Sequence, residues 1–371
     1  KITRLVATTT SAPAAQSLAV KVRRAADAED NIFVPLVNKG DVLPASGQLQ
    51  LKSGAMLKAG MAGYIGFEVF QVEVPDRVDL NLCIGLLRIE GADLPPDLVI
   101  RIGDPIIFGW HMSAGGVLRA SVTLPESNNL VLPTKHFYAP QAAEISYNGE
   151  EGHAFTQAIL ARAQEEWGDL AAAVGPNAGP DLALLKARIE EQNEILEESR
   201  GDAEAVRRIS EEARFIRQEA ARIEAKHQSA VLQRRLGKVV AAYNRIGRGR
   251  AEESDNKIFD DLSMRAQKII DSQHESTHAA ARLCLSQMRR LFLSVAWGNP
   301  AYVEAWFDRL AKDSWLYADK AAFAAMLAEG AALREKSDHD GLRTLVEKML
   351  EARLSLGASD TVNDLATVVR G

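Results

Sequence analysis

Cysteine is scarce in this sequence. Only Cys83 and Cys284 occur among 371 residues, far apart along the chain. Small secreted domains depend on several closely spaced cysteines, so a disulfide framework is excluded. We therefore expect a reducing, cytoplasmic location.

Long apolar runs and an excess of positive charge are also missing. No run reaches the ~18–20 apolar residues of a membrane-spanning helix, and no secretion signal opens the chain. Lysine and arginine number 44 against 50 acidic residues, a net charge of −6. This balance gives no bulk attraction to nucleic acid or to an anionic bilayer. We expect neither nucleic acid nor membrane among the partners.

Phosphate-binding and hydrolase motifs are absent as well. The sequence has no Walker-type loop, no dinucleotide fingerprint after a strand and no nucleophile elbow. We expect no enzyme activity from this chain and no cofactor within it. It begins at Lys1 without a methionine, which we interpret as a fragment of a longer protein.

Proline divides the chain into two halves. Ten of the 13 prolines precede residue 150, and only Pro176, Pro180 and Pro300 follow it. Short β-branched runs with period-two alternation, separated by turn residues, fill the first half and predict an antiparallel sandwich. These runs are Ser17–Val22, Ile32–Val37, Gln48–Leu51, Tyr64–Val74, Cys83–Ile89, Leu98–Ile102, Ile106–Trp110 and Val117–Leu124.

The second half is predicted to be helical. Helices are expected over about 152–173, 181–199, 202–244, 254–297, 300–312, 318–336 and 340–355. The third carries an a/d heptad seam of Val206, Ile209, Ala213, Ile216, Ala220 and Ile223. Because a seam must be buried, it predicts either an internal helical hairpin or a coiled coil that binds a partner or dimerises. The fold class is α+β in two segregated domains, an N-terminal antiparallel β-sandwich followed by an elongated α-helical lid or hairpin domain.

One motif resembles a zinc site. His274-Glu275-Ser276-Thr277-His278 matches H-E-x-x-H within an expected helix, where the two histidines could chelate zinc and Glu275 could activate water. Glu304 is a loose candidate for the third ligand. The flanking residues look like ordinary helix surface, so a zinc protease is the minor alternative. Likewise, the arginines of residues 245–250 fit a helix cap and turn better than a phosphate contact.

The β half, taken in order, resembles the substrate-binding domain of the DnaK-type 70-kDa heat-shock chaperones. The resemblance is carried by S-L-A-V-K-V (17–22), F-V-P-L-V-N-K-G-D-V-L-P-A (33–45), G-Y-I-G-F-E-V-F-Q (63–71), L-R-I-E-G-A-D-L-P-P (87–96) and F-G-W-H-M-S-A-G-G-V-L-R-A-S-V (108–122). It covers about 110 residues, with the helical half matching that family's lid more loosely.

This resemblance implies a module that holds extended apolar segments of unfolded client proteins. A sandwich with long loops can bind a peptide through backbone hydrogen bonds and one apolar pocket. The family's pocket, carried over by position, falls on Val20, Val22, Leu51, Ile65 and Phe67, with Leu36 beneath. The same alternation is also compatible with a plain sandwich core.

The resemblance further implies a domain plan and partners. Residues 1–15 correspond to a linker, 16–150 to the peptide-binding sandwich, 151–356 to the helical lid or extension and 357–371 to a flexible tail. ATP and Mg would belong to an upstream ATPase domain, with a J-domain co-chaperone and a nucleotide-exchange factor as partners. The rival interpretation is a structural or adaptor module whose long helices bind a partner.

Overall fold

The computed structural model describes residues 12–24, 31–61, 63–75, 77–132, 147–175, 179–317, 319–352 and 368–370. The chain forms two compact units, and each is described by itself. One unit joins residues 1–145 to residues 355–371, and the other comprises residues 146–354. A β region and a helical region are therefore segregated, as the sequence predicts, but the β region also takes in the C-terminal end of the chain.

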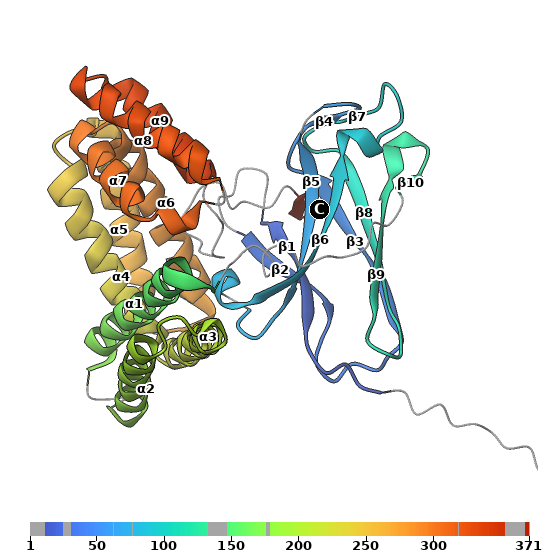
Figure 1. Cartoon of the computed structure of the whole chain (residues 1–371), viewed down its shortest axis with the longest axis horizontal. Helices are drawn as coiled ribbons and strands as arrows, with labels where there is room; N and C mark the ends of the chain where they lie inside the picture. Colours follow the sequence, from blue (N-terminus) through green and yellow to red (C-terminus); the bar gives the residue numbers. More distant parts are fainter. Residues whose placement is uncertain are drawn as a thin grey trace, which may run out of the picture. The chain divides into compact units, whose positions relative to one another are not determined.

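The β unit contains short strands from the start of the chain and one strand from its end (Figure 1). The strands are β1 (Leu18–Arg23), β2 (Asn31–Val37), β3 (Ala45–Ser53), β4 (Leu57–Lys58), β5 (Tyr64–Gln71), β6 (Leu82–Glu90), β7 (Val99–Ile100), β8 (Pro105–Met112), β9 (Leu118–Leu124), β10 (Leu130–Leu132) and β11 (Val368–Arg370). Each of the eight predicted runs overlaps a strand. The strand β11 falls in the stretch expected to be a flexible tail, so the structure differs from that expectation at these three residues.

The main sheet is curled and mixed. Its order is β10-β9-β8-β3-β11-β1-β5-β6, and β2 pairs with the other edge of β1. A wholly antiparallel sheet is wrong, because β11 runs parallel to β1 and antiparallel to β3. In the described strands the halves β2-β1-β5-β6 and β3-β8-β9-β10 are connected by hydrogen bonding only through β11.

Apolar side chains from both halves share one core. The rings of Phe67 on β5 and Phe108 on β8 stack with centroids 5.2 Å apart. Alternation along β9 sends Ala120, Val122 and Leu124 into the same core. The period-two pattern of the sequence therefore corresponds to one buried face on each half.

Residues 12–15, within the expected linker, also contact the β unit. Pro13 forms a bridge with Val42, and Ala14 is buried. The Ala14 N–H donates to the carbonyl of Asp41 at 2.8 Å, and its carbonyl accepts from Gly40 at 2.8 Å. This end of the segment is thus a packed part of the β unit.

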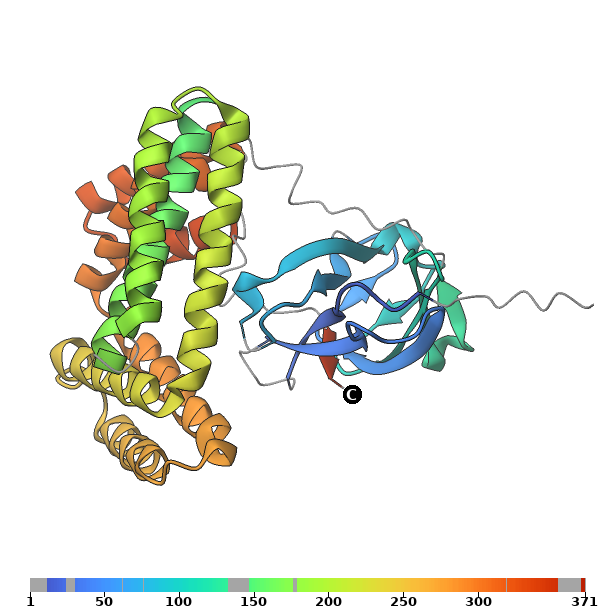
Figure 2. The ribbon, with the colours of Figure 1, turned by 90° about the horizontal axis from the view of Figure 1, so that it is seen from below.

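The helical unit contains nine α-helices in its described residues. They are α1 (Gly149–Val174), α2 (Gly179–Glu198), α3 (Ala203–Lys226), α4 (Gln228–Ala242), α5 (Glu253–Asp271), α6 (His278–Trp297), α7 (Pro300–Lys312), α8 (Lys320–Glu335) and α9 (His339–Ala352). Helices α1, α2 and α3 lie side by side as long rods (Figure 2).

The heptad seam is buried inside this unit. Its six residues on α3 are at most 7% exposed, and they pack with α1 and α2 in two clusters. Arg217 beside the seam donates to both carboxylate oxygens of Glu166 on α1, at 2.8 and 3.0 Å. The internal hairpin is confirmed, and the seam does not present an open surface to a partner.

Two expected helices are interrupted. The segment expected over 202–244 breaks at His227, whose backbone leaves the helical region, and α4 follows. The segment expected over 254–297 breaks between Asp271 and His278, where Gln273 has a left-handed φ of 53°. None of the described helices has both the length and the apolar character required to cross a bilayer.

Candidate functional site

The strand β1 changes partner along one of its edges. Its first half, from Leu18 to Val20, pairs with β5. Its last residue, Arg23, pairs instead with Val369 of β11. The edge of β1 that β5 leaves is therefore occupied by the C-terminal strand.

The strand β3 offers a second edge to β11. One edge of β3 pairs with β8 from Ala45 to Lys52. The Ser53 N–H donates to Asp104 O at 2.9 Å on that same side. Neighbouring residues of a strand direct their backbone N–H and C=O groups to opposite edges. The backbone groups of Lys52 therefore face β11, where Lys52 is paired with Val369.

Together these edges form a slot, which we define as the facing edges of β1 at Arg23 and of β3 at Leu51–Ser53. It is filled by Val368, Val369 and Arg370. Figure 2 shows this short red strand among the blue strands from the first part of the chain. An extended segment in the slot adds a strand between two edges, which is the geometry of β-augmentation.

The side chains of β11 differ in burial. Val368 is 0% exposed and belongs to the core cluster, Val369 is 3% exposed, and Arg370 is exposed. Val368 is opposite Ser53, whose side chain is buried with its hydroxyl donating to the Ala55 carbonyl at 2.5 Å. The slot therefore accepts an aliphatic side chain from a segment that is remote in sequence.

The five residues predicted to line a peptide pocket lie in the same cluster as Val368. All are 0–3% exposed, and Leu36 also belongs to this cluster, at 7%. They are Val20, Val22, Leu51, Ile65 and Phe67. With β11 in place they are core residues, and Val368 is the member of that core that comes from the C-terminal strand.

Sequence reasoning missed β11 itself. Adjacent valines favour an extended strand, and V-V-R is a weak signal of that kind. Three residues are too few for periodicity to predict a strand, and their partners lie some 300 residues earlier.

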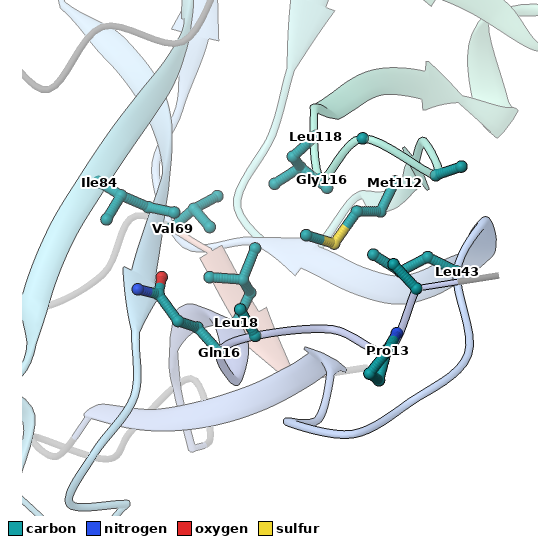
Figure 3. Close-up of a pocket in the computed structure, with 13 residues that line it drawn as sticks. Pro13, Gln16, Leu18, Leu43, Val69, Ile84, Met112, Gly116 and Leu118 are labelled. Atoms are coloured by element: carbon teal, nitrogen blue, oxygen red, sulfur yellow. The ribbon is translucent and has the colours of Figure 1, made fainter. Parts of the chain in front are cut away.

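A separate apolar pocket of about 580 Å³ lies near the opposite end of β1. Figure 3 shows Leu18 and Val69 from one half of the sheet, with Met112 and Leu118 from the other, around the same space. Leu18 is five residues from Arg23, or roughly 16 Å along a strand. None of the five predicted pocket residues lines it.

The zinc motif does not have the geometry that it requires. His274 lies in the break before α6 and is exposed, whereas His278 opens α6 and is buried. The Nε2 atom of His278 is 3.0 Å from the hydroxyl of Ser229. Glu304 lies instead 3.8 Å from Nδ1 of His339. The expectation of both histidines on one helix is wrong, and the described residues include no group of three such ligands.

The arginine-rich turn after α4 is part of the helical packing. Both terminal nitrogens of Arg248 bind the carboxylate of Asp260, at 2.5 and 3.1 Å. The guanidinium lies 5.6 Å from the ring centre of Tyr243. This ion pair holds the pKa of Asp260 below its ordinary value. Arg248 thus joins the turn to α5.

Comparison with known proteins gives no family. No protein-family model and no curated protein sequence matches this chain. The DnaK-type resemblance therefore rests on the sequence motifs, and the functional argument rests on the slot.

Proposed function

We propose that this chain is the peptide-holding portion of a DnaK-like chaperone, and that the slot between β1 and β3 receives extended aliphatic segments of client proteins. One observation carries the proposal: a sequence-remote strand, β11, adds to both edges and buries Val368 in the apolar core to which the five predicted pocket residues belong. A client segment would make the same backbone pairing, which requires no particular sequence.

The sandwich form belongs to this proposal. The halves β2-β1-β5-β6 and β3-β8-β9-β10 would be its two layers, with Phe67 against Phe108 between them. A client strand would enter where the two layers diverge. The helical unit would act as the lid, and ATP-driven control with its co-chaperones would come from an upstream domain, in the cytoplasm.

The test is fluorescence anisotropy of a labelled, leucine-rich peptide of about seven residues, titrated with the full chain. We expect saturable binding with a dissociation constant on the order of micromolar, near −8 kcal/mol. An all-polar peptide of the same length is the control. Since the backbone is common to both peptides, their difference measures the aliphatic pocket.

The site at which the peptide binds is located with a photo-reactive group on the same peptide. We expect cross-links to Arg23 and to residues 51–53, which form the two edges. Cross-links confined to the pocket around Leu18 and Met112, or to the helical unit, would contradict the slot as the binding site. The adaptor alternative predicts the latter result.

A further inference from the structure

We propose that Val368–Arg370 is an internal ligand of the slot, so that client segments bind in competition with it. This inference rests on the proposed function and names both the class of ligand and its competitor. The ligand class is an extended segment with two adjacent aliphatic residues, as in Val368 and Val369. The competitor is the chain's own C-terminal strand.

The strand β11 is attached to the β unit by few backbone pairs. It is three residues long, and it pairs with β1 at one position and with β3 at three. The stretch 353–367 separates it from the end of α9. A short strand at the end of a long connection must offset the entropy of closing that loop. A strand of three residues makes few backbone hydrogen bonds, so its local opening requires less free energy than unfolding of the whole β unit.

Within each half of the sheet, strands β1–β10 are paired without β11. β1 has β2 and β5 as partners, and β3 has β8. The two halves also share the core through stacked Phe67 and Phe108. When β11 leaves, two facing edges and the space of two buried valines become available. A second segment of the same chemistry fits the space that β11 vacates.

The expected strength of competition follows from effective concentration. A segment tethered within reach of its own site is presented to it at an effective concentration on the order of millimolar. If the free segment bound with a dissociation constant of about 10–100 µM, the internal strand would fill the slot in roughly 90–99% of molecules. Clients would then bind the intact chain about 10–100-fold more weakly than they bind the open slot, so a micromolar constant for the full chain corresponds to about 10–100 nM for the open slot.

The experiment compares the full-length chain with Val368→Asp, using the labelled aliphatic peptide. A carboxylate in the apolar cluster disfavours the closed state, so we expect at least tenfold tighter peptide binding. Val368→Ala should give an intermediate gain, because it removes only part of the buried side chain. Val131→Asp is the matched control, since Val131 on β10 is 60% exposed and far from the slot in the strand order.

A second arm uses a synthetic peptide with the sequence of residues 365–371, L-A-T-V-V-R-G. It should displace the labelled peptide from the Val368→Asp chain. The same peptide with both valines changed to serine should not. Failure of the native sequence to compete would overturn the assignment of β11 as an internal ligand.

A third arm locates the client through the backbone of β3. Lys52→Pro in the Val368→Asp chain removes the N–H that faces the slot, whereas Lys52→Ala retains it. We expect a further two- to tenfold loss of affinity for the proline variant only. Equal loss in both would place the client away from this edge and overturn the inference.

The outcomes separate the two proposals. Equal, saturable binding by the wild type, Val368→Asp and Val131→Asp would overturn the internal ligand and leave the peptide-holding function intact. No binding by any of the three, with amide exchange of β1–β10 still protected, would overturn both. In that case β11 would be an integral strand of the fold.

Discussion

Asn81 illustrates how one buried side chain organises an irregular connection. Its Oδ1 accepts from the N–H groups of Glu73 and Val74, at 2.6 and 2.9 Å. Its Nδ2 donates to the carbonyls of Val74 and Arg77, at 2.8 and 2.5 Å. The side chain is thus the common partner of four backbone groups between β5 and β6, and it fixes where β6 begins.

Replacing Asn81 by leucine should be costly. The substitution leaves buried N–H and C=O groups without partners, so the free energy of unfolding of the β unit should fall by about 2–4 kcal/mol. Denaturant titration followed by amide exchange in β5 and β6 measures the change. Asn81→Asp keeps an oxygen that can accept from the two N–H groups, so it should be more stable than the leucine variant. Its advantage should grow in acid, because a protonated carboxyl can also donate to one of the two carbonyls. A loss below about 0.5 kcal/mol would mean that water replaces the amide.

At the scale of elements, an ion-pair cluster connects α1 to α4. The carboxylate of Asp169 on α1 accepts hydrogen bonds from Lys238 and Arg234 on α4. Burial alone would raise the pKa of Asp169, but these two cations outweigh it, and the pKa lies below its ordinary value. The ionised form is therefore the one that the folded helical unit stabilises.

The sign of this shift predicts a pH dependence. A carboxyl whose pKa is lower in the folded state contributes stability above its unfolded pKa, near 4, and loses it as the pH falls through the folded value. Asp169→Asn should therefore destabilise the helical unit at pH 6 by less than about 1 kcal/mol, because the pair is partly solvated. The difference from wild type should diminish as the pH falls below about 4 and the carboxyl is protonated in both states. Thermal unfolding at pH 6 and at a series of acidic pH values measures it, and a difference that does not diminish in acid would show that the carboxylate charge is not responsible.

Elements were predictable where the local chemistry is strong. Pro300 at the first turn, after an Asn299 side chain that accepts from the Ala301 N–H at 3.2 Å, marks the start of α7. Alternation predicted β9 in the same way. The breaks at His227 and Gln273 carry neither glycine nor proline, so helical periodicity runs through them and no local signal predicts either break.

The candidate site was only partly predictable, for a physical reason. Val20, Val22, Ile65 and Phe67 follow from strand alternation and from a family resemblance. Their companion Val368 comes from a three-residue segment whose strand conformation depends on two distant edges. Contacts of that sequence separation leave no local pattern, and only the folded sheet brings them together.

At the scale of the whole molecule, the two units should respond differently to a client. A ligand that binds only the folded β unit stabilises it by about 2.7 kcal/mol at 100 times the dissociation constant. In the Val368→Asp chain, the aliphatic peptide should raise amide protection in β1, β3 and β5 and leave α4–α6 unchanged. Exchange followed by mass spectrometry of peptic fragments measures both units in one sample. Protection confined to the helices would contradict the slot as the binding site.

The position of β11 in the chain also determines when the slot can be filled during synthesis. The strands β1 to β10 are complete by Leu132, whereas Val368 follows after the entire helical unit. At ~5–20 residues per second, the roughly 230 intervening residues take on the order of 10–50 s to emerge. During that interval the newly made β unit has two facing edges and no strand of its own to place between them. Under the proposed function, a nascent molecule would be open to clients until Val368–Arg370 has been made.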